Sequence, residues 1–484
     1  MGHVIYLVAP SDQRVVVDEI GARFQASDAV EDIGIVVETD ADRAVLETES
    51  EVAYDRIDVA PDLSPDWMRA RNRSDLPEEA PSIDTLRERY GRPFLTPYVV
   101  ADARYDAASR RDWVTLVRTA FGFFEKIINE YEPSVLLAPD VNRPFEWVPA
   151  QVAATTGTYY WWKTTRVGNR HGLIEGSPYE NFCGFEAYDR VIAGEYDPTE
   201  KAREQAKAYV NQVRRSAAKP EFFARRKKSY GSGWTTLVFP HGAPGAREGI
   251  GMLWDRFAGA DRGLDDKRLP RATNISRRLR TRISDPFERP RPDEPFVFFP
   301  LHAQPEPSTR ILAPAFEDQL TLARQAARSL PVDHYLYVKD HPRMWRDNTR
   351  SHRYYKELAS IPGVRVLDPN ADSHTLIDES HAVLSVVGTP AMEAAFYETP
   401  SVVFGPAHFT ALPSVRHCLS VSDLPEILFW ALTDRTYERS ALVDYLAVVF
   451  EHSFPIDAAG SSDAAQRSVA EAVAPQVLAA LRSD

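Results

Sequence analysis

The chain has 484 residues, of which 44% are apolar, a formal net charge of −13 and two cysteines. This length exceeds the usual size of one hydrophobic core, so we expect two domains. Two cysteines exclude a disulfide framework and a thiolate metal site, and the absence of any apolar run longer than a strand excludes a membrane-spanning helix. Residues 1–9 carry neither a basic leader nor a cleavage site, so they predict a strand, and we expect a cytoplasmic protein.

Charge is distributed unevenly along the chain. Between Arg214 and Arg291 there are 19 basic and 8 acidic residues, so this segment carries +11 and the remainder −24. Basic clusters such as residues 225–228 bind anionic lipid or polyanionic glycan, which predicts peripheral contact with the inner face of a membrane. A solvated linker is the alternative. No aromatic-interleaved or helix-turn-helix pattern accompanies the charge, so we expect no nucleic-acid partner.

The first half of the chain has an α/β pattern. Apolar runs at 4–9 and 33–37 predict strands on either side of a helix over 16–24. The turn after the first strand has no glycine, which argues against a dinucleotide phosphate loop. The same alternation predicts a strand near 54–59, a helix over 113–131, a strand at 134–138, a helix over 146–156, a strand at 159–162 and a helix over 198–215.

Two carboxylates in this half are candidates for catalysis. Asp140 follows a predicted strand, at the edge where doubly wound sheets bind ligands. A capping or turn aspartate is the common alternative for this residue. Glu146 opens a predicted helix, where a carboxylate is favourable without any function, and it is therefore the second candidate.

The second half begins with a continuous apolar run at 295–301. Such a run, bounded by turn residues, predicts a strand covered on both faces and hence a parallel sheet. A short strand at 234–240 is predicted within the basic segment. Further predicted elements are a helix over 316–330, strands at 334–339, 382–387 and 399–405, a short strand at 418–421 and helices up to residue 481.

The strand at 334–339 ends in Lys339-Asp340-His341-Pro342. Proline biases His341 to an extended conformation and ends the strand there. A histidine at this edge can donate a hydrogen bond or a charge to a phosphate, and Lys339 can add positive charge. The alternative for His341 is a purely structural role.

A second polar strand end is Ser385, which is followed by a turn through Gly388 and Thr389 into a helix. Backbone N–H groups and the two hydroxyls would face an anion at the positive end of this helix. Glu393 lies one turn further on, where it can accept hydrogen bonds from ribose hydroxyls. A capping glutamate that binds nothing is the alternative.

Three motifs together resemble those of the capsule polysaccharide biosynthesis family, which includes bacterial Kdo transferases. They are Phe-Pro-Leu-His-Ala-Gln-Pro-Glu-Pro-Ser-Thr at 299–309, Lys-Asp-His-Pro at 339–342 and Ser-Val-Val-Gly-Thr-Pro-Ala-Met-Glu-Ala-Ala at 385–395. The resemblance implies an α/β fold of the GT-B type, with two Rossmann-like domains whose parallel sheets face a central cleft. The expected divisions are an acceptor domain at 1–215, a basic linker or insertion at 216–292, a nucleotide-sugar-binding domain at 293–430 and C-terminal helices at 431–484 that pack back on the first domain.

The resemblance also implies roles for individual residues. In this family the histidine before proline and the glycine turn bind the donor phosphate, and the helix glutamate binds the donor hydroxyls. The family's Gln-X-Glu loop is matched as well. These residues are His341, Pro342, Ser385, Gly388, Thr389, Glu393, Gln304 and Glu306, with Lys339 as a further donor contact and Glu306 as a third catalytic candidate. Val386 and Val387 depart from the pattern, because a smaller polar residue often precedes the glycine in this family.

The resemblance implies a glycosyltransferase that moves a sugar from a nucleotide-activated donor, with a CMP-Kdo-like donor favoured, to a surface polysaccharide or glycolipid acceptor. Such a site must stabilise the departing phosphate and deprotonate an acceptor hydroxyl. No metal-binding constellation stands out, so we expect neither a metal nor a cofactor. The alternatives are a CDP-polyol phosphotransferase of the teichoic-acid type and a non-catalytic binding protein of the same fold.

Overall fold

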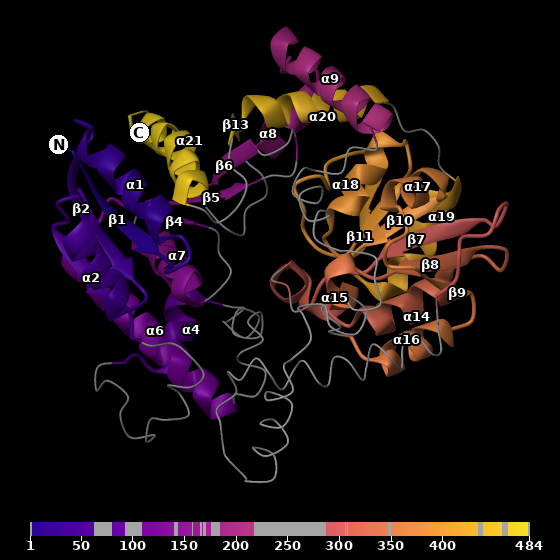
Figure 1. Ribbon diagram of the computed structural model, residues 1–484, viewed down its shortest axis with the longest axis horizontal. Coiled ribbons are helices and arrows are strands. Elements are labelled where there is room, and N and C mark those ends of the chain that lie inside the picture. The colour runs from indigo at the N-terminus through magenta and orange to yellow at the C-terminus, as the bar shows by residue number, and fades with distance from the viewer. Residues whose placement is uncertain are drawn as a thin grey trace, which may run out of the picture.

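The structure, a computed structural model, describes residues 2–61, 80–91, 109–139, 144–156, 158–164, 167, 171–175, 184–216, 287–304, 306, 308–346, 350–433, 439–456 and 463–482. Its strands form two sheets (Figure 1). The first, here called the N-sheet, has the order β13-β6-β5-β4-β1-β2-β3. The second, the C-sheet, has the order β12-β11-β10-β7-β8-β9.

The N-sheet is mostly parallel. Its strand β6 (His171–Glu175) pairs antiparallel with β5, and β13 (Phe454–Pro455) pairs antiparallel with β6. The parallel strands are β1 (His3–Ala9), β2 (Val30–Val37), β3 (Arg56–Val59), β4 (Val135–Pro139) and β5 (Thr158–Thr164). Their spatial order, 3-2-1-4-5, is that of a doubly wound fold.

The C-sheet is parallel throughout its described strands. These are β7 (Phe296–Pro300), β8 (Tyr335–Lys339), β9 (Val364–Leu367), β10 (Ala382–Ser385), β11 (Ser401–Val403) and β12 (Val415–His417). Counted from β7, their order is 3-2-1-4-5-6, so the expected α/β fold with two Rossmann-like parallel sheets is confirmed. The central cleft between the sheets stays a prediction.

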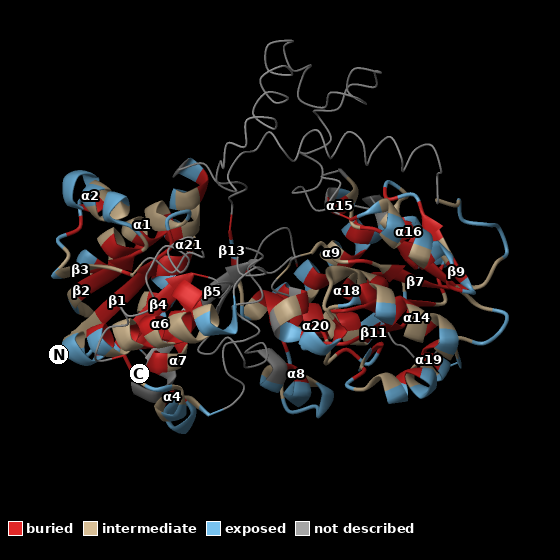
Figure 2. Ribbon diagram, turned by 90° about the horizontal axis from the view of Figure 1, so that it is seen from below, coloured by how far each residue is buried: buried red, intermediate tan, exposed pale blue. Residues whose placement is uncertain are grey.

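Helices cover both faces of the N-sheet. Because side chains alternate along a strand, Tyr6 and Val8 pack on one face while Ile5 and Leu7 pack on the other. The first face is covered by α4 (Ile83–Tyr90), α6 (Arg110–Tyr131) and α7 (Pro144–Thr156), and the second by α1 (Arg14–Gln25) and α21 (Asp463–Leu481). Most strand residues whose burial is described are buried, and the outer helix faces are exposed (Figure 2).

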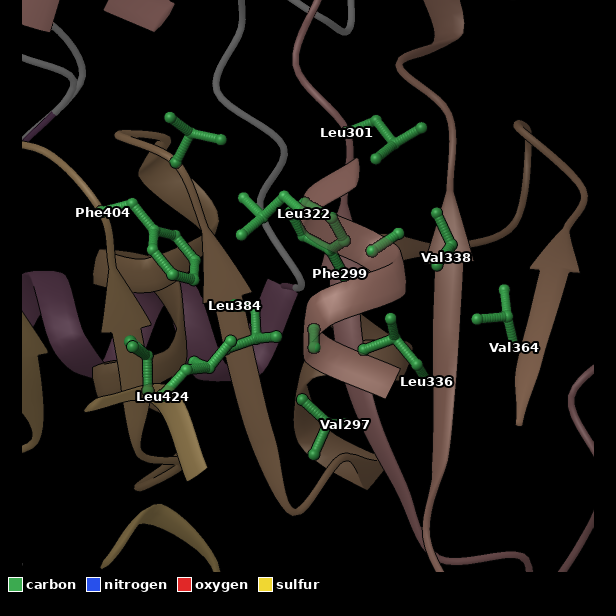
Figure 3. Packing of buried hydrophobic residues seen from close by; sticks show 14 of the residues in the cluster. Val297, Phe299, Leu301, Leu322, Leu336, Val338, Val364, Leu384, Phe404 and Leu424 are labelled. Carbon is green, nitrogen blue, oxygen red and sulfur yellow. The ribbon is translucent and has the colours of Figure 1, made fainter. Parts of the chain in front are cut away.

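The C-sheet is covered in the same way. Val297 and Phe299 of β7 pack into the cluster drawn in Figure 3, and Phe296 and Phe298 face the opposite side. The helices on the first side are α14 (Gln319–Ser329), α16 (His352–Ala359) and α19 (Leu424–Thr433), and those on the second are α17 (Ser373–Glu379) and α18 (Thr389–Phe396). Burial of both faces explains why β7 has no polar position.

A further apolar cluster joins helices that are far apart in the sequence. It contains residues of α8 (Gly184–Ile192), α9 (Glu200–Ser216), α18 and α20 (Arg439–Glu451). Glu451 of α20 accepts hydrogen bonds from the Tyr196 hydroxyl and the Thr199 backbone N–H, both at 2.7 Å. Beyond α20, β13 joins the N-sheet and α21 packs on α1, so the chain returns to its first sheet (Figure 1). The domain limits at 215, 292 and 430 stay predictions.

Two predicted elements differ from the structure. The helix expected over 316–330 is α14, preceded by a 3-10 turn at Pro314–Phe316, because the Asp318 side chain accepts from the Leu320 and Thr321 N–H groups and caps the helix there. The strand expected at 418–421 is wrong: β12 ends at His417, and Val421–Asp423 is a 3-10 turn.

Some elements were not predicted at all, and others cannot be compared. Strand β6 and helix α2 (Asp40–Glu49) have no counterpart among the predicted elements. The strand expected at 234–240 and most of the basic segment lie outside the described residues. In the described part of the chain, no helix is both long and apolar enough to span a lipid bilayer.

Candidate functional site

Both sheets have a switch point, the place where the strand order reverses and where doubly wound folds bind ligands beyond the carboxyl strand ends. In the C-sheet it lies between β7 and β10. Phe298 is in register with Val383, so the end of β7 lies beside the end of β10. This brings His302, which follows β7, next to Ser385, the last residue of β10: His302 Nε2 is 3.3 Å from Ser385 Oγ.

The turn from β10 into α18 is closed by side chains. The Gly388 N–H donates to Ser385 Oγ at 2.9 Å, and the Val387 N–H donates to His302 Nε2 at 3.2 Å. Gly388 is the N-cap of α18, and Pro390 stands in the first turn. A Cβ on Gly388 would lie 2.6 Å from Ser385 Oγ and 3.0 Å from His302 Nε2, so the close approach of the imidazole requires glycine here.

His302 is held on its other side by Glu306. Its Nδ1 is 3.1 Å from Glu306 Oε2, and its side chain is 8% exposed. Since Nε2 accepts from the Val387 N–H, the neutral ring carries its proton on Nδ1 and donates it to the carboxylate. His302 therefore links the predicted Gln-X-Glu loop to the predicted phosphate turn.

A buried ion pair, Arg350 with Asp340, is hydrogen-bonded to the same loop. The Arg350 guanidinium donates to Asp340 Oδ1, to the His302 carbonyl at 2.7 Å and to Gln304 Oε1 at 3.2 Å. The Tyr355 hydroxyl also donates to Asp340. Burial lowers the pKa of Arg350 and raises the pKa of Tyr355 to about 12. Arginine stays charged even so, because its ordinary pKa is far above neutral.

The predicted residues at the end of β8 adjoin this network. The His341 backbone N–H donates to Asp340 Oδ1 at 2.7 Å, and Pro342 begins the short helix α15 (Pro342–Arg346). Lys339 is 5% exposed, and its Nζ donates to Ser373 Oγ at 2.9 Å, at the start of α17. Because β8 lies beside β7, His341 follows the strand next to the one that leads to His302.

The remaining donor-site predictions lie on two segments. Thr389 and Glu393 are partly exposed residues of α18. The Gln304 side-chain amide donates to the Glu317 carbonyl at 2.7 Å, in addition to accepting from Arg350. The structure thus brings Gln304, Glu306, Ser385 and Gly388 together through the loop that contains His302.

In the N-sheet the switch point lies between β1 and β4, and the described carboxylates beyond β1 lie on its other side, that of β2. The Ser11 N–H donates to Glu38 Oε2 at 2.8 Å, and its hydroxyl donates to Asp42 Oδ2 at 2.6 Å. Asp140 immediately follows β4 and lies outside the described residues. Glu146 is 3% exposed in the first turn of α7, among apolar neighbours.

Sequence reasoning missed two residues of this site. His302 carried a usable signal, because it follows the first strand of a Rossmann-like unit and precedes Glu306 by four residues. Arg350 carried none, since its partners Asp340 and Gln304 are recognisable only in the fold. Among the described residues, no three histidine, cysteine or acidic side chains are grouped so that they could hold a metal ion.

Comparisons with known proteins give structural neighbours only. No family model matches the chain, and no curated protein matches its sequence. Among solved structures, a KpsC β-Kdo 2,7-transferase from Thermosulfurimonas dismutans is 10% identical, with a TM-score of 0.38 over 75% of this chain and 90% of that one. A β-Kdo 2,4-transferase of the same name and organism is 10% identical, with a TM-score of 0.36 over 65% and 79%.

UDP-GlcNAc 2-epimerases also occur among the neighbours. The enzyme from Neisseria meningitidis, bound to UDP-GlcNAc, is 11% identical, with a TM-score of 0.25 over 93% of this chain and 98% of that one. Similarity at this level does not specify a reaction.

Proposed function

We propose that the protein is a glycosyltransferase that binds a nucleotide-activated sugar at the C-sheet switch point. The observation that carries this proposal is the meeting of His302, Ser385 and the Gly388 turn beyond the carboxyl ends of β7 and β10. A glycine turn that leads into a helix presents backbone N–H groups and a positive helix end to an anion. The strand order puts this feature where doubly wound sheets bind nucleotides.

The proposed chemistry divides between the two sheets. Ser385, Gly388, Thr389 and His341 stabilise the phosphate that leaves with the nucleotide, since donors aimed at a developing charge lower the barrier. Glu393 and Gln304 orient the donor, and Lys339 adds positive charge at the end of β8. At the N-sheet switch point, Asp140 removes the proton of the acceptor hydroxyl, with Glu146 and Glu306 as the other candidates.

The substrates are a finer part of the proposal. We favour a CMP-Kdo-like donor and a surface polysaccharide or glycolipid acceptor, on the resemblance of the three motifs alone. The basic segment between Arg214 and Arg291 is proposed to hold the protein at an anionic membrane surface, where such acceptors are found.

A thermal-shift screen tests the nucleotide site. Purified protein is heated with CMP, CDP, UDP, UMP, GDP or ADP, and the series is repeated with His341→Ala. A ligand present at a hundredfold its dissociation constant stabilises the folded state by about 2.7 kcal/mol, which raises the midpoint visibly. We expect one nucleotide to stabilise the wild type and to do so much less in the variant.

Two results would contradict the proposal. Stabilisation by no nucleotide removes the donor site. Turnover of a CDP-alcohol together with rejection of every nucleotide sugar replaces the glycosyltransferase by a polyol phosphotransferase.

A further inference from the structure

His302 occupies an unusual position for a residue beside an anion site. In the structure its Nε2 is an acceptor, and it uses the Val387 N–H, one of the donors that the turn would offer to a phosphate. Ser385 Oγ uses the Gly388 N–H in the same way. Both N–H groups are therefore engaged by side chains of the protein itself, and a bound phosphate must compete with them.

Protonation of His302 would reverse this arrangement. An imidazolium has no acceptor, so the Val387 N–H would be released, and Nε2 would become a donor. One proton thus breaks the hydrogen bond between the Val387 N–H and His302 Nε2. It leaves two donors at that place, the Val387 N–H and the Nε2–H. The Nδ1 side needs no change, because Nδ1 already donates to Glu306 in the neutral ring.

We infer that His302 takes up a proton when the donor phosphate binds and so switches the turn from a self-bonded to a phosphate-bonded state. The proton comes from bulk solvent and forms the Nε2–H bond. No other covalent bond changes. This role rests on the proposed nucleotide site and makes His302 a phosphate-binding residue there.

The other charges near His302 are accounted for among the described residues. On its own loop it faces Glu306, and from β10 it faces the neutral hydroxyl of Ser385. From α14, Gln319 accepts the His302 backbone N–H at 2.7 Å and is uncharged. Arg350, which donates to the His302 carbonyl, is neutralised by Asp340. His341 follows the neighbouring strand and is the second histidine that must be controlled for.

Isothermal titration calorimetry measures the proton directly. CMP and UDP are titrated into the full-length protein at pH 7.5 in two buffers that differ in ionisation enthalpy, with cytidine and uridine as phosphate-free probes. A phosphate monoester is almost fully ionised at this pH, so the nucleotide itself contributes little. We expect net proton uptake with the nucleotide that binds and none with its nucleoside.

Two variants of His302 separate a switch from a structural support. In His302→Gln the side-chain amide reaches the position of Nε2 and keeps an acceptor for the Val387 N–H, whereas the shorter His302→Asn removes that acceptor. A purely structural role makes Gln the better substitute. The switch predicts loss of proton uptake in both variants, because neither side-chain amide takes up a proton at this pH.

Controls come from histidines elsewhere in the C-sheet. His334→Gln alters the pair that His334 forms with His381 at 3.0 Å, before the amino ends of β8 and β10, and should leave uptake unchanged. His341→Gln should weaken binding but retain uptake. Nitrogen-15 NMR of the histidine rings adds a readout that is independent of affinity: a neutral Nδ1–H form of His302 without nucleotide and a doubly protonated ring with it.

The outcomes are distinct. Nucleotide binding without proton uptake, or uptake that persists in His302→Gln, overturns the role of His302 while the proposed function stands. Binding of neither CMP nor UDP, nor of any nucleotide in the thermal-shift screen, removes both.

Discussion

The edges beyond β7 and beyond β1, the first strands of the two sheets, follow the same strand topology and carry different side chains. In the C-sheet, a histidine and a glycine turn meet beyond β7 and β10, and the turn leads into a helix. In the N-sheet, Ser11 after β1 is hydrogen-bonded through both its backbone N–H and its hydroxyl to carboxylates, those of Glu38 and Asp42. The first place presents a histidine and the start of a helix, and the second presents carboxylates, one of which lies 3.6 Å from the Arg14 guanidinium. The loops, and not the strand order, therefore give the two edges their different side chains.

The two edges also differ in how firmly they are built. Beyond the C-sheet strands, Arg350 and Asp340 are 5% and 1% exposed and bond to both neighbouring loops. Beyond the N-sheet strands, the hydrogen bonds of Ser11 lie at the surface. A buried frame of this kind suits the binding of a phosphate in one geometry, as we propose for the C-sheet edge.

The largest expected effect concerns the N-sheet edge. Replacement of the proposed base, Asp140→Asn, should lower turnover by roughly 10²–10⁴-fold, the usual contribution of a general base, while nucleotide affinity stays unchanged. Turnover and calorimetric binding are measured on the same preparation. Asp42→Asn, at the same edge, is the matched control and should lower turnover far less. A loss of nucleotide binding in Asp140→Asn as large as its loss of turnover would contradict the proposal that the two sheets bind donor and acceptor separately.

The buried ion pair comes next. Arg350→Met leaves Asp340 buried without its positive partner, which should reduce the free energy of unfolding by about 3–5 kcal/mol. Chemical denaturation followed by circular dichroism measures this loss. Arg324→Met breaks the more exposed pair with Glu357 and should cost less than about 1 kcal/mol. Similar losses in both variants would mean that Arg350 does not hold the C-sheet edge.

The glycine of the turn should have a smaller effect that is confined to the site. In Gly388→Ala the new methyl group would displace Ser385 Oγ and the His302 ring, a strain of about 1–3 kcal/mol. Nucleotide affinity should fall by roughly tenfold or more, as calorimetry would measure. Gly363, whose φ of 79° disfavours alanine but which has open space around it, supplies the control: Gly363→Ala should lower stability and spare affinity. An unchanged affinity in Gly388→Ala would exclude a phosphate at this turn.

The smallest effect is a pH dependence away from the site. Hydrogen bonds from Arg365, followed by one from Tyr337, keep the pKa of Glu294 below its usual range. A lowered folded-state pKa stabilises the protein above the ordinary glutamate value near 4.3, and this stability is lost as the pH falls below it. In Glu294→Gln the stability should fall less steeply as the pH is lowered, as measured by thermal melts between pH 3 and 7. A fall that is just as steep in the variant would contradict this role of Glu294.

Much of the C-sheet could be predicted from the sequence because most residues of its central strands are buried. The apolar runs that contain β7, β8 and β10 are continuous and end in polar residues, and Pro390 marks the start of α18. The edge pairing of β6 with β13 could not be predicted, because Gly172 and Phe454 are 282 residues apart and β13 is two residues long.

The site was predicted in part for the same physical reason. Ser385 and Gly388 lie within four residues of each other, so their turn is visible as a local pattern. His302 is paired with Ser385 across 83 residues, and Arg350 reaches His302 across 48. Such contacts depend on β7 and β10 being neighbours in the sheet, which local periodicity does not state.

The most direct test of the central claim is a crystal structure of the protein with the nucleotide that stabilises it. The account predicts the phosphate beyond the ends of β7 and β10, with its oxygens about 3 Å from the N–H groups of the Gly388 turn and from His302 Nε2. A phosphate bound beyond the strands of the N-sheet instead would contradict it.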